Sequence, residues 1–135
     1  MATLLQQKEF LSANAPYAAQ AAEALGTSPA TLLAQSAYET GWGTSQVYQQ
    51  NNNVAGINEP GSQTGEEYAS YPSLAAGWSG YQDVLSLQRY SGASGLYGEN
   101  FANYVNNAGY STNPNYGEEY AGVYQDVLKL TGDQY

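Results

Sequence analysis

Apolar residues recur at helical spacing along most of the chain, and this pattern predicts a mainly α-helical fold. Residues 3–25 are expected to form one or two helices, with Pro16 starting the second and Gly26 ending it as a left-handed cap. Ser28, which is followed by proline, fits the N-cap of the next helix, and that helix should stop at Gly41.

Helical spacing returns in the second half of the chain. Ser73 is expected to cap a helix whose apolar face is formed by Leu74, Trp78, Tyr81, Leu85 and Gln88. Further helices are predicted over residues 99–107 and from about residue 115 onward.

Between these two halves, residues 41–72 show no helical period and are rich in glycine and asparagine. We call them the lobe and expect an irregular structure with a short β-hairpin around residues 62–71. A long irregular stretch within a compact domain is uncommon and often functional. No internal repeat or linker is visible, so residues 1–135 are predicted to form one domain.

Composition excludes several classes of function. The chain has no cysteine and no histidine, which excludes disulfides, thiol nucleophiles, Ser-His-Asp chemistry and imidazole metal sites. We therefore expect neither a metal nor a cofactor. Twelve acidic residues against three Lys and Arg give a net charge of −9, which disfavours nucleic acids and anionic membranes as partners. Acid–base chemistry must come from Asp, Glu, Tyr or the three cations.

Glu39 has the position that acid catalysis requires. It lies near the end of a largely apolar helix, next to Tyr38 and three residues before Trp42. The negative end of the helix dipole and the aromatic neighbours both raise the pKa of a carboxyl group. A carboxyl that stays protonated near neutral pH can serve as the general acid of a glycosidase. Position alone also fits an ordinary surface glutamate.

Four ordered blocks make the interpretation more specific. They are Leu-Ala-Gln-Ser-Ala-Tyr-Glu-Thr-Gly-Trp-Gly at 33–43, Asn-Val-Ala-Gly-Ile at 53–57, Tyr-Ala-Ser-Tyr-Pro-Ser-Leu at 68–74 with a later Arg-Tyr pair, and Gly-Tyr-Ser-Thr-Asn-Pro-Asn-Tyr at 109–116. Together they resemble the glucosaminidases of the flagellar-rod-hydrolase and autolysin type, glycoside hydrolase family 73. The resemblance covers about residues 15–130 and implies a lysozyme-like helical fold acting on peptidoglycan.

The resemblance places the family's catalytic acid on Glu39. It also suggests a set of substrate-binding residues, namely Gln35, Trp42, Asn53, Gly56, Ile57, Tyr90, Tyr116 and Tyr120. Three of these have structural alternatives: Trp42 in the core, Asn53 on the loop backbone and Gly56 in a turn. The chain departs from the family at Ala55, where relatives have Phe, and at Ser70, where they have Arg, and both changes concern substrate affinity.

A second carboxylate is less clearly marked. Family members carry one in a hairpin after the Asn-x-Phe-Gly-Ile block, but this region is shorter here. Glu67 is the first candidate, Glu66 the alternative, and Glu59 is also present. A separation of about 5 Å from the acid indicates direct attack, and ~6.5–9.5 Å leaves room for water. With no second carboxylate, the substrate's acetamido group could attack, or the reaction could be intramolecular as in lytic transglycosylases.

The expected function is endo-β-N-acetylglucosaminidase activity on the β-1,4 glycan of peptidoglycan. An N-acetylmuramidase or a lytic transglycosylase with the same acid is the alternative. A non-catalytic module that binds wall glycan, or an assembly or spike component, would be a different class. We expect a monomer that acts on the cell wall, whether secreted, periplasmic or virus-associated, although the first residues do not resemble a signal peptide.

Overall fold

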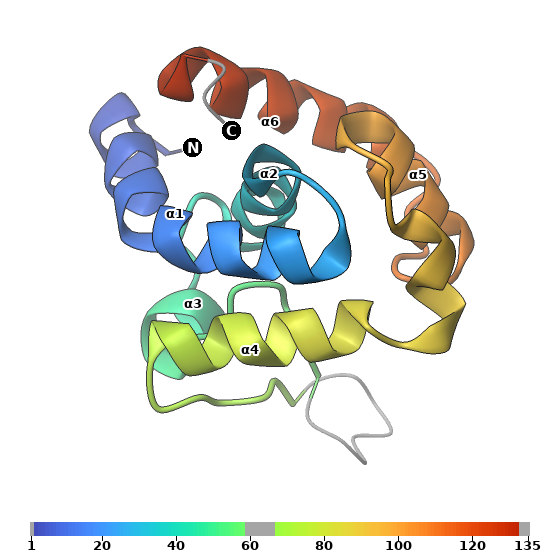
Figure 1. Cartoon of the computed structure of the whole chain (residues 1–135). Helices are drawn as coiled ribbons and strands as arrows, with labels where there is room; N and C mark the ends of the chain where they lie inside the picture. The colour runs from blue at the N-terminus through green and yellow to red at the C-terminus, as the bar shows by residue number, and fades with distance from the viewer. Residues whose placement is uncertain (1, 59–66, 133–135) are drawn as a thin grey trace.

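A computed structural model describes residues 2–58 and 67–132, and these residues confirm the mainly α-helical fold. Figure 1 shows the arrangement of the helices. In chain order they are α1 (Leu4–Leu25), α2 (Pro29–Thr40), α3 (Gln46–Asn51), α4 (Leu74–Leu85), the 3-10 helix η1 (Gln88–Ala93), α5 (Gly98–Asn107) and α6 (Tyr116–Thr131).

Residues 4–25 form one helix, so the second helix expected to start at Pro16 does not exist. The Thr3 side chain accepts from the Gln6 amide to begin the helix, and Gly26 ends it with φ 74°. Pro16 lies within the helix and is exposed. Buried residues on both sides of it, such as Leu11 and Ala18, continue one packed face, which offsets the hydrogen bond that proline cannot make.

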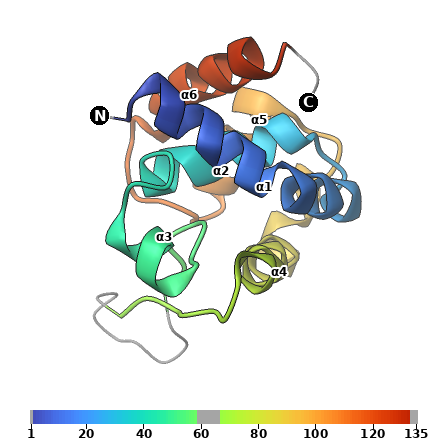
Figure 2. The ribbon, with the colours of Figure 1, turned by 90° about the vertical axis from the view of Figure 1, so that its left-hand side faces the viewer.

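Helix α2 is the centre of the domain. Nine of its twelve residues are buried, and α1, α5 and α6 all contact it. Figures 1 and 2 show α2 enclosed by other helices from two directions. Ser28 caps its start and Gly41, with φ 58°, ends it as the sequence predicts. A helix buried on nearly all sides holds its last turn, and the side chain of Glu39, in a fixed place.

The lobe contains a short helix that the sequence did not predict. Helix α3 has no buried residue, so its sequence carries no apolar period to recognise. The only strand-like pairing that we find in the described part of the lobe is a single antiparallel bridge between Asn58 and Tyr68. Residues 62–66, half of the hairpin expected at 62–71, lie outside the described residues.

Helix α4 packs closely against the lobe. A Cβ atom at Gly77 would lie 1.9 Å from the Asn52 carbonyl oxygen, and one at Gly80 would overlap the Tyr71 ring. Glycine at these two positions therefore allows the lobe backbone to touch the helix. The end predicted for this helix was too late, because Gln88 opens η1 instead of closing the α4 face. In the described part of the chain, no helix is both long and apolar enough to cross a membrane.

Candidate active site

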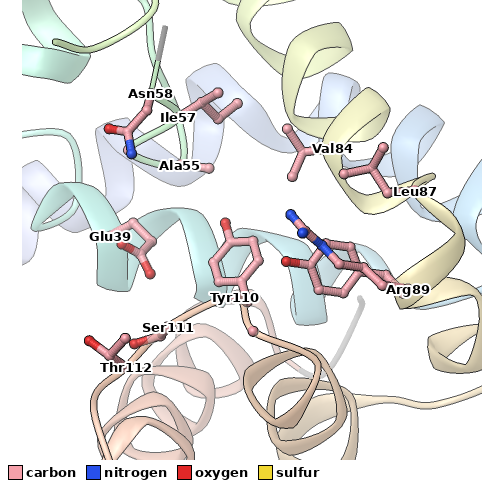
Figure 3. Close-up of a pocket in the computed structure, with 13 residues that line it drawn as sticks. Glu39, Ala55, Ile57, Asn58, Val84, Leu87, Arg89, Tyr110, Ser111 and Thr112 are labelled. Atoms are coloured by element: carbon pink, nitrogen blue, oxygen red, sulfur yellow. The ribbon is translucent and has the colours of Figure 1, made fainter. Parts of the chain in front are cut away.

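A cleft of about 580 Å³ opens at the end of α2. Three segments far apart in the sequence form its walls: residues 55–58 of the lobe, the region from the end of α4 to Tyr90, and residues 109–112 before α6. Figure 3 shows Glu39 on one side of this cleft and Arg89 on the other, with Tyr110 between them. A smaller hollow of about 210 Å³ on the lobe side also includes Glu39 and is bordered by Tyr68.

Burial changes the acidity of Glu39. Removal of water raises the pKa of its carboxyl from 4.5 to about 7, and a hydrogen bond from Tyr116 works in the opposite direction. The carboxyl is therefore about half protonated at neutral pH. A group with such a pKa can both give up and take back a proton during one reaction cycle.

Hydrogen bonds fix the last turn of α2 beneath the carboxyl group. The Thr40 hydroxyl donates to the Ser36 carbonyl over 2.7 Å and accepts from the Gly43 amide over 3.0 Å. The Trp42 amide donates to the Ala37 carbonyl over 2.9 Å. These bonds satisfy carbonyl and amide groups that a helix end leaves open, so the turn that carries Glu39 is well held.

Asn53 anchors the lobe wall of the cleft. Its side-chain amide donates to the carbonyls of Ile57 and Ala69, and its carbonyl accepts from the amides of Ala55 and Ile57. Asn53 is fully buried, so its polar atoms serve the loop backbone and do not face the cleft.

Gly56 lies close to the Glu39 carboxyl. Its φ of 64° favours glycine, and a Cβ atom there would lie 3.7 Å from Glu39 Oε2. Gly56 and Ile57 both line the cleft, and their contact with substrate stays a prediction. The loop is tied back to α2 because the Ser36 hydroxyl donates to the Val54 carbonyl over 2.6 Å.

A chain of buried polar groups leads to Glu39 from the interior. The Tyr81 hydroxyl donates to Gln35 Oε1, and Gln35 Nε2 donates to the Tyr116 hydroxyl over 2.8 Å. The Tyr116 hydroxyl also lowers the pKa of the Glu39 carboxyl, in part offsetting the effect of burial. Gln35 and Tyr81 have no exposed surface and Tyr116 is 1% exposed. We call this set the amide–hydroxyl chain.

Of the remaining residues predicted to bind substrate, one lines the cleft and two lie elsewhere. Tyr90 lines the cleft, with the Arg89 guanidinium carbon 5.0 Å from its ring centroid. Tyr120 is fully buried and donates to the Thr31 carbonyl. Trp42 lies against Phe10 and lines a different hollow on the other side of the α2 end.

The second carboxylate is not among the residues that form the described cleft. Of the described residues bordering the cleft and the smaller hollow, Glu39 is the one carboxylate. Glu67 is exposed and directly precedes Tyr68 of the smaller hollow. Glu59 and Glu66 lie outside the described residues. No group of three or more carboxylates that could hold a metal ion occurs in the part of the chain that the structure describes.

Sequence reasoning did not select several residues that line the cleft. These are Val84, Leu87, Arg89, Tyr110, Ser111 and Thr112. Arg89, Tyr110 and the two hydroxyl residues belong to the recognised blocks, so the signal was present. Burial and the nearby Glu39 carboxylate raise the pKa of Tyr110 well above its usual value, so its hydroxyl stays protonated and can donate a hydrogen bond in the cleft.

A polar cluster borders the cleft near Ser111 and Thr112. The Tyr38 hydroxyl donates to Glu119 over 2.6 Å, and the Asn113 side-chain amide donates to the same carboxylate over 2.9 Å. These two bonds lower the pKa of Glu119. Burial is the main cause that raises the pKa of Tyr38 to about 12, and the hydrogen bond to Glu119 adds to it. Glu119 therefore stays ionised and, unlike Glu39, does not present an acidic proton.

Comparison with known proteins identifies one family over most of the chain. Residues 15–129 match the glucosaminidase family, described as mannosyl-glycoprotein endo-beta-N-acetylglucosaminidase. The peptidoglycan hydrolase FlgJ of Vibrio parahaemolyticus is 30% identical over 148 residues, which cover 91% of this chain and 48% of that protein. The chain spans less than half the length of the curated relatives that it matches.

Solved structures share the fold over nearly their full length. A peptidoglycan hydrolase from Sphingomonas sp. A1 superposes with a TM-score of 0.82 at 28% identity, covering 93% of each chain. The glycoside hydrolase domain of Salmonella typhimurium FlgJ gives a TM-score of 0.77 at 28% identity, covering 93% of this chain and 91% of that one.

Proposed function

Because the chain belongs to the glucosaminidase family, we propose that it hydrolyses the β-1,4 glycan of bacterial peptidoglycan, as an endo-β-N-acetylglucosaminidase with Glu39 as its general acid. The observation that carries this proposal is a carboxyl group that opens onto a cleft of about 580 Å³ and whose burial raises its pKa to about 7. The substrate class follows from relatives named peptidoglycan hydrolases.

In the proposed reaction, Glu39 gives its proton to the oxygen that bridges two sugars. The bond from that oxygen to the anomeric carbon breaks, and the leaving sugar departs with a new hydroxyl group. Positive charge develops on the remaining sugar ring. The ionised Glu39 then takes a proton from the water that adds to the anomeric carbon, which restores the acid for the next cycle.

The group that attacks the anomeric carbon is a separate part of the proposal. Glu67 is our candidate because it is exposed in the lobe beside Tyr68, which borders the smaller hollow shared with Glu39. If the substrate's own acetamido group attacks, a carboxylate at this position is unnecessary. Glu67→Gln separates the two routes: strong loss of activity supports Glu67, and native activity supports the acetamido route.

The main experiment is digestion of purified cell walls with native protein and with Glu39→Gln. We expect the native protein to release fragments that end in reducing N-acetylglucosamine, and the variant to lose at least about a hundredfold in rate. Reducing N-acetylmuramic acid would instead identify a muramidase, and anhydro products a transglycosylase. Walls that are bound but never cleared by the native protein would indicate a binding module. Full activity of Glu39→Gln would overturn the assignment of the acid.

A further inference from the structure

The loop between α5 and α6 forms one wall of the cleft. It comprises residues 108–115, and its Ser111 and Thr112 line the cleft together with Glu39 (Figure 3). A surface loop holds a wall in place only where it is bonded to rigid elements of the fold. The bonds that join this loop to α2 therefore decide how well the wall is defined.

Asn113 is the residue that connects the loop to its surroundings. Its side-chain amide donates to the Glu119 carboxylate over 2.9 Å and to the Tyr38 hydroxyl over 3.2 Å. Its side-chain oxygen accepts from the Asn115 amide, and its own backbone amide donates to the Ser111 hydroxyl over 3.0 Å. Among the described residues, the bond to Tyr38 is the one hydrogen bond that we find between this loop and α2.

The Glu119 carboxylate joins three elements at one oxygen. Glu119 belongs to α6, and its Oε1 accepts from Tyr38 of α2 over 2.6 Å and from Asn113 of the loop. Hydrogen bonds to an ionised carboxylate are stronger than bonds between neutral groups. Tyr38 directly precedes Glu39, so these bonds fasten the wall to the turn that carries the acid. We call Tyr38, Asn113 and Glu119 the clamp.

We propose that the clamp holds the wall formed by Ser111 and Thr112 in place beside Glu39 before the glycan binds, which makes its members positioning residues. This proposal rests on the proposed function. The three clamp residues are not among the described residues that line the cleft, so they act on the substrate through the wall. A wall that is ordered in advance spares binding the entropy of ordering it.

Loss of the clamp should weaken binding and leave the chemistry intact. Without the clamp, each glycan that binds must order the wall, in the ground state and in the transition state alike. Such a uniform loss raises KM and does not change kcat. The pKa of Glu39 is raised by burial and lowered by Tyr116, and neither cause depends on the clamp. The alkaline limb of the rate profile should therefore stay near pH 7.

Tyr38→Phe and Glu119→Ala test the clamp from its two ends. Tyr38→Phe removes the hydroxyl and keeps the ring, which lies 5.1 Å from the Tyr116 ring between centroids. The probe is a preparation of soluble glycan strands from purified walls. For each variant we expect KM to rise about threefold to tenfold and kcat to stay within about twofold of the native value.

Three further variants separate positioning from a general loss of packing. In the double variant of Tyr38→Phe and Glu119→Ala, KM should be close to that of either single variant, because both changes break the same cluster. Glu119→Gln keeps an acceptor oxygen at the same length, so its KM should return to within about twofold of native. Glu118→Ala is the control, because it removes the neighbouring exposed carboxylate, and its KM should equal the native value.

Urea melts show whether each variant is folded under the assay conditions. Native KM in folded Glu119→Ala would overturn the proposal, as would independent KM effects in the double variant or a KM in Glu119→Gln as high as in Glu119→Ala. An alkaline limb at lower pH would also overturn it, because water would then have reached Glu39.

Glu39→Gln, measured in parallel, keeps the two hypotheses apart. If it is inactive while the clamp variants keep native KM, only the clamp fails. If it is active, the proposed function fails.

Discussion

The environment that keeps Glu39 protonated should also cost the protein stability. The pKa of Glu39 is about 7 in the folded chain and 4.5 for an unperturbed glutamate. The folded state therefore binds a proton that the unfolded state releases at neutral pH. At 1.36 kcal/mol per pKa unit, this difference corresponds to an unfavourable contribution of about 3 kcal/mol above pH 7.

The sign of this contribution sets its dependence on pH. Below pH 4.5 the carboxyl is protonated in both states and has no net effect on the free energy of unfolding. The penalty grows as pH rises from 4.5 to about 7 and is complete above that value. Glu39→Gln removes the ionisable group while keeping its shape. The variant should match the native protein near pH 4 and be more stable by up to about 3 kcal/mol at pH 8.

Thermal melts from pH 4 to pH 8 measure this effect. A gain of about 3 kcal/mol corresponds to a rise in Tm on the order of 10 °C for a domain of this size. Glu118→Gln is the control, because it removes an exposed carboxylate of α6 and one negative charge without touching the cleft. If the native and Glu39→Gln curves run parallel over the whole range, the carboxyl is not desolvated as the structure indicates, and the explanation for its acidity is wrong.

Two further predictions concern the cleft and the lobe. The chain has a net charge of −9, and Arg89 is the one cation among the described residues that line the cleft. Arg89→Gln should therefore raise KM severalfold for wall fragments that carry carboxylates and leave KM for a neutral N-acetylglucosamine oligomer unchanged. Initial rates on both substrates measure this, and equal effects on both would contradict a charge-based role. Gly77→Ala should lower the free energy of unfolding by ~1–3 kcal/mol, because the new methyl group would lie 1.9 Å from the lobe backbone. Gly122→Ala in α6 has open space around it and should raise the free energy of unfolding by ~0.5–1 kcal/mol. Urea melts measure both changes. Equal changes for the two glycine variants would contradict the tight contact.

Much of the fold could be predicted from the sequence, because capping residues mark where several helices begin or end. Ser28, Gly26, Gly41 and Ser73 all cap helices where the sequence indicates. The failures have physical causes. Pro16 reads locally as a helix start, but packing on both sides of it keeps one helix intact. Helix α3 has no fully buried residue, and its Tyr48 is only partly buried against the core, so little apolar pattern is left to detect.

The candidate site was predictable only in part. Glu39 could be selected from its position and from a recognisable motif, and the structure places it in the wall of the cleft, but its role as the acid stays a proposal. The functions of Gln35 and Tyr120 could not be inferred, because a polar residue within a motif looks the same whether it faces a ligand or the interior. Only the fold reveals that Gln35 bonds Tyr81, 46 residues away, and Tyr116, 81 residues away.

Asn53 and the Asn58–Tyr68 bridge make the lobe tolerant of changes in length. Together they join the two ends of the segment between residues 58 and 68. Each doubling of a closed loop costs only about 0.6 kcal/mol. Insertions and deletions in that segment can therefore accumulate without moving Glu39.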